Sequence, residues 1–301
     1  MTDSEKPVIE VRNLTQRYGK GRIIYENLTF DVPRGRILGL LGKNGTGKTT
    51  TINILMGFLK PQAGTCRIFG EDITAMRPDT RSRIALLIEG HVQYAFMTIE
   101  QIEKFYSHFY PEWNREAYYE LMRKLHVSPR QRISSMSCGQ RSQVALGLIL
   151  AQNADLLVLD DFSLGLDPGY RRLFVEYLRD FVRSEDKTVF MTSHIIQDLE
   201  RLIDDCIILD YGKILVQTPV ADLMRDFSRY VFRTDSDVLA ALSLDSAIVN
   251  PARIGNEVEL YTFRSREYVE SVLNKTGADF SSLEQTPMSL EDAFIGLTGK
   301  Y

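Results

Sequence analysis

The residues whose types and spacing most directly suggest chemistry lie between positions 42 and 49. Their sequence, GKNGTGKT, matches the pattern G-x-x-x-x-G-K-[ST] at every fixed position. Glycines allow a backbone to curve around an anion with several N–H groups directed at it, and a helix that begins there adds positive potential. Lys48 would supply a charge for β- and γ-phosphates, and the Thr49 hydroxyl would be placed to bind Mg²⁺. The stretch therefore predicts a phosphate-binding loop for a nucleotide.

The segments on either side of this loop are the ones that it requires. Residues 36–41 are short and apolar, which is typical of a buried strand, and residues 50–58 carry apolar side chains at helical spacing. The alternative is a glycine turn that matches the pattern by accident. The order of strand, loop and helix argues against that alternative.

Length and composition exclude several classes of protein. A chain of 301 residues can form one large or two modest domains, and 44% hydrophobic and 25% charged residues are ordinary for a globular protein. The net charge of −4 gives no electrostatic reason to expect nucleic acid as a partner. No apolar run is long enough for a membrane span, and no signal peptide is visible. Because Cys66, Cys138 and Cys206 form neither a disulfide framework nor a metal cluster, we expect a cytoplasmic protein.

Strand-like and helix-like segments alternate through much of the chain. Strands are expected at residues 8–12, 28–32, 36–41, 65–69, 84–88, 155–161, 188–192, 206–209 and 213–216. Residues 98–152 are helical in pattern instead, which indicates helices inserted between two strands of the sheet. This alternation predicts an α/β fold whose core sheet is largely parallel.

Two further expectations concern packing. A helix over residues 170–182 should turn five apolar side chains toward the core, namely Leu173, Phe174, Tyr177, Leu178 and Phe181. The aromatic residues between positions 105 and 119 should pack in a core or an interface rather than form a cofactor cage.

The pattern changes again after about residue 228. Short strands at residues 230–232 and 257–261 then stand among helical stretches. We therefore expect a first domain over residues 1–228, with a helical subdomain near residues 91–152. A small α+β accessory domain is expected over residues 229–301.

Three more motifs, read together with the phosphate-binding loop, resemble those of the ABC-type ATPases. Residues 136–140 (MSCGQ) resemble the LSGGQ signature of that family, and residues 159–168 (LDDFSLGLDP) resemble its LDEPTSGLDP stretch. Residues 192–194 (TSH) resemble its switch histidine. These elements occur in the family's order and cover roughly residues 7–220. The resemblance implies a P-loop NTPase core with a mixed sheet and an inserted helical subdomain, which binds ATP and Mg²⁺ and hydrolyses ATP.

The resemblance also implies a head-to-tail dimer of two copies, or of this chain and a paralogue. Each ATP would lie between the phosphate-binding loop of one subunit and the signature helix of the other. The implied ATP-binding residues are Tyr18, Gly42, Lys43, Asn44, Gly45, Thr46, Gly47, Lys48, Thr49, Thr50, Ser137, Gly139, Gln140 and Asp167. Tyr18 would stack on the adenine, and Asp167 would link the two sites. The alternatives are an ordinary strand-end tyrosine for Tyr18 and a plain helix cap for Ser137.

The resemblance assigns the chemistry to a few polar residues. The implied metal ligands are Thr49, Asp160 and Glu89, with Asp160 acting through a water molecule. The implied catalytic residues are Asp161, His194 and Lys48. Asp161 would polarise the attacking water, and His194 would form hydrogen bonds to the γ-phosphate and that water. The alternatives are a solvated strand end for the acidic pair and a structural role for the histidine.

Three positions depart from the family pattern. Asp161 stands where the family usually has a glutamate, and its shorter side chain predicts slow hydrolysis or a greater reliance on His194. Glu89 stands where a glutamine is usual, with Gln93 as a weaker candidate for that place. Cys138 replaces a glycine, so a left-handed backbone there would cost free energy.

The expected function is to drive a membrane ABC transporter, with ATP-driven dimer closure coupled to an integral membrane permease on a separate chain. The protein would be peripheral on the inner face of the cell membrane. Residues 287–299 resemble the tail common in bacterial exporter ATPases of the ABC-2-like group, which favours an exporter. The permease would dock on the helical insertion and on residues 89–97.

Two other functions compete with transport. A regulatory ABC ATPase with slow hydrolysis is the alternative that Asp161 favours. A nucleic-acid-directed ATPase is disfavoured because the chain has no basic stripe and no second cassette.

Overall fold

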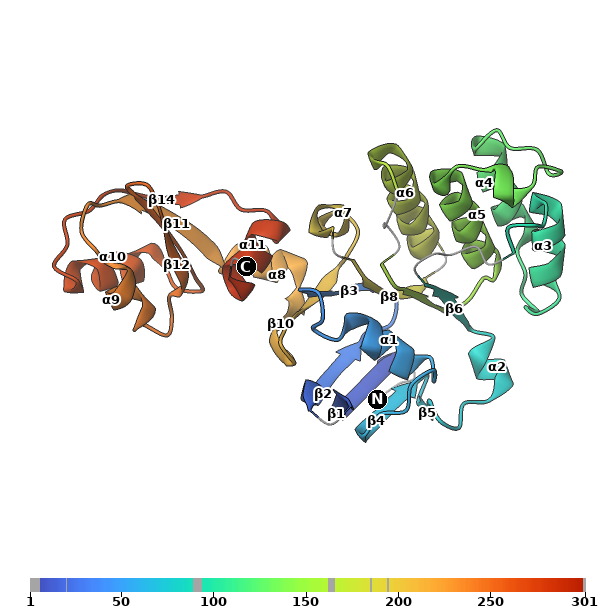
Figure 1. Ribbon diagram of the computed structural model, residues 1–301, viewed down its shortest axis with the longest axis horizontal. Helices are drawn as coiled ribbons and strands as arrows, with labels where there is room; N and C mark the ends of the chain where they lie inside the picture. The colour runs from blue at the N-terminus through green and yellow to red at the C-terminus, as the bar shows by residue number, and fades with distance from the viewer. Residues whose placement is uncertain are drawn as a thin grey trace. The chain divides into compact units, whose positions relative to one another are not determined.

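The computed structural model describes residues 6–19, 21–88, 94–161, 166–184, 186–193 and 195–299. The chain forms two compact units, Met1–Ile214 and Leu215–Tyr301. The division falls within strand β10 (Lys213–Pro219), ahead of the domain boundary expected after residue 228. Figure 1 shows the helices and strands of both units with their labels.

The first unit is built on a largely parallel sheet in the order β10-β9-β3-β8-β7-β6. Its other strands are β3 (Ile37–Gly42), β6 (Ile84–Leu87), β7 (Leu156–Leu159), β8 (Thr188–Thr192) and β9 (Asp205–Asp210). β3 runs parallel to β8 and β9, and β7 runs parallel to β6 and β8. The parallel core sheet expected from the sequence is confirmed.

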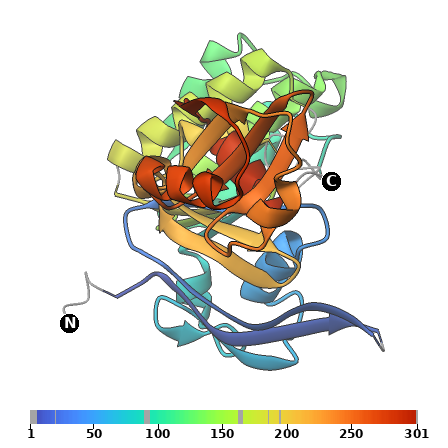
Figure 2. The same cartoon turned by 90° about the vertical axis from the view of Figure 1, so that its left-hand side faces the viewer.

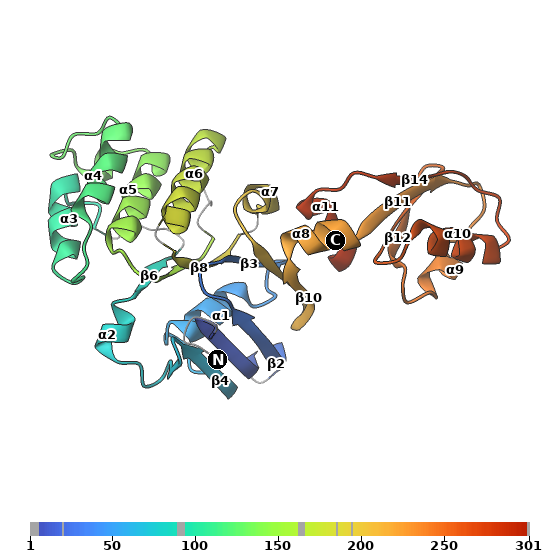
Figure 3. The same cartoon turned by 180° about the vertical axis from the view of Figure 1, so that it is seen from behind.

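Helices cover both faces of this sheet. In Figure 1 and Figure 3, α1 (Lys48–Leu55) lies on one side, and α5 (Cys138–Ala151) and α6 (Pro168–Ser184) lie on the other. β3, β7 and β8 are therefore buried throughout. Because a strand that is covered on both faces has no side open to water, these strands consist mostly of apolar residues.

An antiparallel sheet in the same unit has the order β2-β1-β4-β5. β1 (Ile9–Tyr18) pairs with β2 (Arg22–Val32) and with β4 (Ala63–Ile68), and β5 (Glu71–Asp72) pairs with β4. β1 and β2 extend well beyond the segments expected from the sequence. The register of β1 is irregular between Val11 and Leu14, where Asn13 has a φ of 51°, and this breaks the alternation that predicts a strand.

One hydrophobic core joins the antiparallel sheet, α1 and the parallel sheet. Phe30 of β2 stacks on Phe190 of β8 with ring centroids 5.8 Å apart, and Ile52 and Leu55 extend into the core from α1. The antiparallel sheet is therefore fixed against the helix that begins at the phosphate-binding loop.

Helices follow one another between β6 and β7, as the sequence predicts. α3 (Ile99–Ser107) and α5 begin with capping boxes at Thr98 and Ser137, and Asn114 caps α4 (Arg115–Lys124). α5 is buried along most of its length, where it contacts α3, α4 and α6. The first unit also contains three short helices, α2 (Pro78–Arg81), η2 (Ile133–Ser135) and α7 (Ile196–Glu200).

The packing of α6 corrects one expectation. Phe174 and Leu178 are buried as predicted, together with Val175 and Val182. The other predicted core residues are only half-buried and line a groove of about 540 Å³ beside α4, namely Leu173, Tyr177 and Phe181. The buried stripe follows positions 174, 178 and 182, so these three side chains lie at its border.

The second unit contains α8 (Val220–Asp226) followed by an antiparallel sheet in the order β12-β13-β11-β14. The strands are β11 (Ser228–Arg233), β12 (Val249–Ile254), β13 (Glu257–Thr262) and β14 (Ser281–Thr286). α9 (Leu239–Ser243) and α10 (Arg266–Lys275) lie between them in chain order, and α11 (Leu290–Thr298) follows. This β-α-β-β-α-β order with antiparallel pairing defines the split β-α-β fold, whose strands are drawn in orange to red in Figure 2.

The core of the second unit is its own. Tyr230 and Phe232 of β11 pack with Val258 and Leu260 of β13, and with residues of α9 and α10. Within the described residues, no helix of the chain has the length and apolar character needed to cross a lipid bilayer.

Candidate nucleotide-binding site

The loop between β3 and α1 has a backbone that requires glycine at several points. Gly45 and Gly47 have φ angles of 80° and 106°, in the left-handed region. A Cβ at Gly47 would lie 2.7 Å from the Tyr25 ring, and one at Gly42 would lie 2.5 Å from the Thr46 hydroxyl. Gly47 precedes α1 at the N-cap position and provides no side-chain cap, so the N–H groups of the helix's first turn are available to an anion.

Lys48, the first residue of α1, folds back over this loop. Its Nζ donates hydrogen bonds to the carbonyl oxygens of Gly42 at 2.6 Å and of Lys43 at 3.1 Å. Burial lowers the pKa of Lys48, while the negative charges of Asp161 and Asp160 act in the opposite direction. The ammonium group is therefore held where phosphate oxygens would meet the loop.

Two carboxylates follow β7 at the same edge of the sheet. Asp160 is 5% exposed, and its Oδ1 accepts hydrogen bonds from the hydroxyls of Thr192 at 2.7 Å and of Thr49 at 3.3 Å. Asp161 has a φ of 49°, a left-handed conformation that aspartate adopts more readily than most residues. The bond between Thr49 and Asp160 joins the end of β7 to the phosphate-binding loop.

These elements surround a hollow of about 320 Å³. The residues that line it are Tyr18, Ile24, Asn44, Gly45, Gly47, Lys48, Thr49, Thr50, Asp160, Asp161 and Thr192. Tyr18 is 45% exposed, and its hydroxyl lies 3.3 Å from that of Thr50. The structure thus brings Tyr18, most of the phosphate-binding loop and the predicted metal ligands Thr49 and Asp160 to one place. It adds Ile24 and Thr192, which were not among the predicted site residues.

Three predicted residues shape the loop from inside instead of lining the hollow. Gly42, Lys43 and Thr46 are buried. The Thr46 hydroxyl donates a hydrogen bond to the Lys43 carbonyl at 2.8 Å, which closes the loop upon itself.

The signature residues lie at the start of α5, away from the lining of this hollow. Ser137 Oγ accepts a hydrogen bond from the Gln140 N–H at 3.2 Å, and Gln140 Oε1 accepts one from the Ser137 N–H at 3.1 Å. Gly139 packs beneath Tyr170, whose ring a Cβ there would meet at 2.3 Å. Within one chain these residues form a closed capping box.

Cys138 does not carry the strain that the sequence suggested. It is the first residue of α5 and is not among the residues with positive φ, so a glycine is not needed at this position. Asp167, by contrast, caps the first turn of α6: its Oδ1 accepts hydrogen bonds from the N–H groups of Gly169 at 2.9 Å and Tyr170 at 3.1 Å.

Several predicted residues lie outside the described part of the chain. These are Glu89 and Gln93, the other residues of 89–93 in the expected docking stretch, and His194. Their roles stay predictions.

The residues around Asp160 fit a magnesium ion that is shared with a nucleotide. In the ranges that the structure describes, no group of three or more His, Cys, Asp or Glu side chains could hold a metal by itself. The Thr49 hydroxyl and the Asp160 carboxylate nevertheless adjoin each other at 3.3 Å beside the phosphate-binding loop. Mg²⁺ in such sites takes one or two protein oxygens and completes its shell with phosphates and water.

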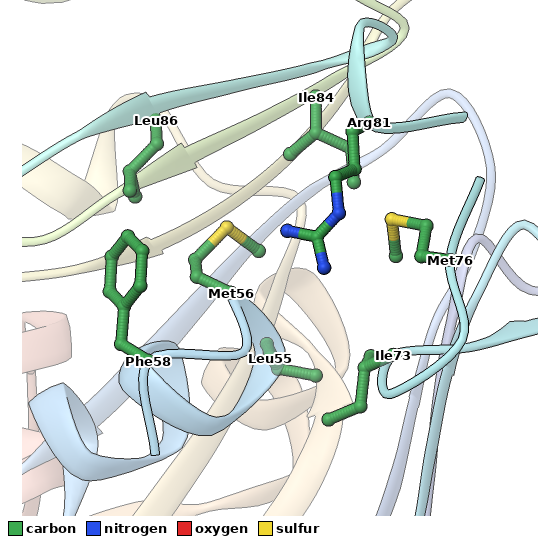
Figure 4. Close-up of a pocket in the computed structure, with 8 residues that line it drawn as sticks. All are labelled: Leu55, Met56, Phe58, Ile73, Met76, Arg81, Ile84 and Leu86. Atoms are coloured by element: carbon green, nitrogen blue, oxygen red, sulfur yellow. The ribbon is translucent and has the colours of Figure 1, made fainter. Parts of the chain in front are cut away.

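An apolar groove of about 140 Å³ lies elsewhere on the first unit. Figure 4 shows its lining side chains, which are Leu55, Met56, Phe58, Ile73, Met76, Arg81, Ile84 and Leu86. They come from the end of α1, from β6 and from the segment between β5 and β6. This lining offers no nucleophile or carboxylate, so the chemistry belongs to the first hollow.

Comparison with known proteins identifies the class of this site. A model of the ABC transporter family matches residues 25–163. The Nod factor export ATP-binding protein I of Paraburkholderia xenovorans (strain LB400) is 30% identical over 299 residues, which cover 97% of each chain. The bacitracin transport ATP-binding protein BcrA of Bacillus licheniformis is 25% identical over 299 residues, again covering 97% of each chain.

A solved structure of an ATP-binding subunit of an ABC transporter superposes with a TM-score of 0.64 at 25% identity, covering 72% of this chain and 92% of that one. The chain therefore belongs to the ABC transporter family, as an ATP-binding subunit that hydrolyses ATP. The fold expected from the sequence, a P-loop ABC ATPase core, is confirmed. ATP-binding subunits of transporters act with a membrane partner.

Proposed function

We propose that the hollow binds MgATP and that the chain hydrolyses ATP within a head-to-tail dimer, as the subunit that uses ATP to drive a membrane exporter. The observation that carries this proposal is the convergence of an uncapped helix start, Lys48 and the pair Asp160 and Asp161 on one hollow. Positive groups for phosphates beside an acidic edge for metal and water are the parts that phosphoryl transfer needs.

The loop and its neighbours would bind the nucleotide. The loop N–H groups and Lys48 Nζ hold the β- and γ-phosphates, and Lys48 exchanges its bonds to Gly42 and Lys43 for bonds to phosphate. The exposed Tyr18 ring stacks on the adenine, a type of contact worth ~1–3 kcal/mol per base. Thr49 and Asp160 hold Mg²⁺, which when bound neutralises charge on the phosphates.

Asp161 would act on the attacking water. Its carboxylate accepts a hydrogen bond from the water that attacks the γ-phosphorus, and ADP and phosphate are the products. The side chain is one methylene shorter than glutamate, and a displacement of ~1 Å can cost on the order of 100-fold in rate. We therefore expect slow hydrolysis, with His194 sharing the positioning of the γ-phosphate and the water.

A second copy, or a paralogue, would complete the site. Ser137, Gly139, Gln140 and Asp167 do not line the hollow of their own chain, although Ser137 is exposed at a helix start that suits a phosphate. A second subunit placed head to tail would bring its Ser137, Gly139 and Gln140 to the ATP, and Asp167 would connect the two sites. ATP binding then favours the closed dimer, and hydrolysis favours the open one.

Export and location are proposed from the relatives. Proteins named for Nod factor export and for bacitracin transport match over 97% of this chain. We place the chain on the cytoplasmic face of the cell membrane, held there by a permease on a separate chain. The ATPase domain would be residues 1–228, with a helical subdomain near residues 91–152, and residues 229–301 would be the accessory domain.

The permease would dock on the helical insertion and on residues 89–97, and its contact would extend to the apolar groove of Figure 4. Phe58 beside the groove and Phe96 in the expected docking stretch are 66% and 67% exposed. The groove is lined by the end of α1, which starts at the phosphate-binding loop, and by β6, which precedes residues 89–97. An apolar segment of the permease bound there would therefore touch elements that continue into the ATP site.

Two measurements test the proposed function. The purified chain should release phosphate from MgATP, and it should co-purify with a polytopic membrane protein when isolated from membranes. Phe58→Asp and Phe96→Asp should weaken that association without changing hydrolysis by the isolated chain, whereas Leu244→Asp, at an exposed leucine of the second unit, should not weaken it. Hydrolysis with no membrane partner would favour the regulatory ATPase that Asp161 suggests, and no hydrolysis would overturn both.

A further inference from the structure

β8 ends at Thr192, between the two strands that lead to the site. On one side it pairs with β3, which continues into the phosphate-binding loop, and on the other with β7, which continues into Asp160. Thr192 is 1% exposed, yet it is part of the lining of the hollow. A hydroxyl buried at this point can form hydrogen bonds to residues that follow the neighbouring strands.

The Thr192 hydroxyl is bonded to both acidic residues at once. Its Oγ1 donates to Asp160 Oδ1 at 2.7 Å and accepts from the Asp161 N–H at 3.1 Å. The same N–H lies 3.2 Å from the Thr192 carbonyl oxygen. A hydroxyl has one proton, so the bond to the carboxylate fixes its direction and leaves a lone pair for the amide.

These bonds hold the chain in a conformation that it adopts only with support. The backbone turns at Asp161 through a left-handed φ of 49° directly after β7. Such a conformation persists where the surrounding structure fixes it, and here the Asp161 N–H is directed at both Oγ1 and the carbonyl oxygen of Thr192. The turn brings Asp161 to the lining of the hollow.

We propose that Thr192 is a positioning residue for ATP hydrolysis, whose hydroxyl orients the Asp160 carboxylate toward the metal and fixes the turn that presents Asp161 to the water. The proposal rests on the proposed function, because that function gives the two acids their roles. Thr49 also donates to Asp160, but at 3.3 Å and from an exposed residue, so the shorter buried bond sets the orientation.

Three variants of the full chain test this role. Thr192→Val replaces the hydroxyl with a methyl group of similar size, and Thr192→Ser keeps the hydroxyl. Thr188→Val is the matched control: Thr188 begins β8, is also 1% exposed, and its hydroxyl accepts a hydrogen bond from the Gly35 N–H at 3.0 Å. Both valine variants therefore remove one buried, bonded hydroxyl from the same strand, at opposite ends.

Three quantities are measured. The first is Mn²⁺ affinity in the presence of a non-hydrolysable ATP analogue, determined by electron paramagnetic resonance. The others are the kcat and KM of ATP hydrolysis and the thermal unfolding of the chain without nucleotide. Thr192→Val should lower Mn²⁺ affinity and kcat by ~10–100-fold, the range for losing a hydrogen-bond partner of a metal ligand. Its KM for ATP should change less than about 3-fold, because the phosphate-binding loop is intact. Thr192→Ser should resemble the unaltered chain, and Thr188→Val should affect unfolding alone.

Two results would overturn the proposal. One is a Thr192→Val chain whose Mn²⁺ affinity and kcat are no lower than those of Thr188→Val. The other is a Thr192→Ser chain as impaired as Thr192→Val, since the hydroxyl would then not be the active feature. Failure of the unaltered chain to hydrolyse ATP would overturn the proposed function instead, and the Mn²⁺ affinities would still decide the role of Thr192.

Discussion

Two helices of the first unit begin in opposite ways, although the proposed dimer directs both at the same phosphates. α1 begins at a left-handed Gly47 with no side-chain cap, and α5 begins at Ser137 with a complete capping box. The start of α1 leaves the N–H groups of its first turn to a ligand, while the capping box at the start of α5 occupies the N–H groups of Ser137 and Gln140. The phosphate-binding loop is therefore open to a ligand along its first turn, whereas in the proposed dimer the signature would offer chiefly the N–H groups that its capping box leaves over, those of Cys138 and Gly139.

Glycine also has a different purpose at the two helix starts. Gly47 has a φ of 106°, so the backbone itself requires glycine there. Gly139 is not among the residues with positive φ, and it is needed because the Tyr170 ring occupies the place of a side chain. Gln143 Nε2 donates to the Tyr170 carbonyl at 3.0 Å, so the second turn of α5 is joined to the first turn of α6.

The largest effect should come from removing the charge of Lys48 at the start of α1. Lys48→Ala should lower nucleotide binding and turnover by ~100–1,000-fold, since it removes a preorganised charge from the phosphates. Phosphate release and nucleotide titration measure this, with Lys60→Ala at an exposed lysine beyond α1 as the control. Unchanged ATPase activity in Lys48→Ala would remove the phosphate-loop assignment.

Asp161→Asn should separate binding from hydrolysis at that same site. Asparagine also adopts left-handed backbone readily, so the change removes the charge with little effect on the turn. Turnover should fall on the order of 100-fold, the scale expected for misplacing a reacting group. Light scattering should then detect a trapped ATP-bound dimer. If this variant hydrolyses ATP at the normal rate, the water is oriented by another residue.

Ser137→Asp tests whether the capped start of α5 faces a phosphate in the proposed dimer. Aspartate caps helices as well as serine does, so thermal unfolding should not change. Its charge would face the γ-phosphate across the dimer and should weaken ATP-driven dimerisation at least ~10-fold, or about 1.4 kcal/mol. The measurement is dimer formation with MgATP in the Asp161→Asn background. Normal dimerisation would leave Ser137 as a helix cap alone.

Gly139→Ala tests whether that glycine provides space. The new methyl group meets Tyr170 at 2.3 Å, so the free energy of unfolding should fall by ~1–3 kcal/mol. Adding Tyr170→Ala should restore part of this loss in a double-mutant cycle measured by denaturant unfolding. Additive effects of the two substitutions would contradict the contact. Gly47→Ala should behave differently, because a backbone strain of about 1–2 kcal/mol adds to the contact with Tyr25, and a smaller neighbour would leave that backbone strain in place.

The smallest effect is expected for Asp161→Glu. Turnover should equal or exceed that of the unaltered chain, because the carboxylate extends farther toward the water. Stability should fall by up to ~1 kcal/mol, since glutamate is less suited to a φ of 49°. Steady-state kinetics and thermal unfolding measure the two effects separately. A loss of turnover would show that the turn at residue 161 is built for the shorter side chain.

The candidate site could be predicted from the sequence where its residues are close in the chain. The phosphate-binding loop occupies residues 42–49, so spacing alone defines its chemistry, and Asp160 follows an apolar strand that is easy to recognise. Ile24 and Thr192 enter the hollow from β2 and β8, and only the pairing of strands brings them there. The left-handed turn at Asp161 has no signature in the sequence.

The second unit was harder to predict for a different reason. β11 and β13 carry apolar residues and were expected, but β12 contains Pro251 and β14 has the polar sequence SSLEQT. Neither edge strand has the alternation that indicates a strand, because an edge strand of a small sheet buries few of its side chains. The sequence therefore indicated an α+β domain without revealing its split β-α-β order.

The pairing of β2 bears on any attempt to trim this protein. In the antiparallel order β2-β1-β4-β5, β2 has β1 as its neighbour, and it carries both Ile24 at the hollow and Tyr25 beneath Gly47. A version that lacks residues 1–19 would keep the phosphate-binding loop and the signature. It would lose Tyr18 and leave β2 without the strand it pairs with, so the packing of Tyr25 against Gly47 would weaken. The smallest fragment that still binds a nucleotide must therefore include β1.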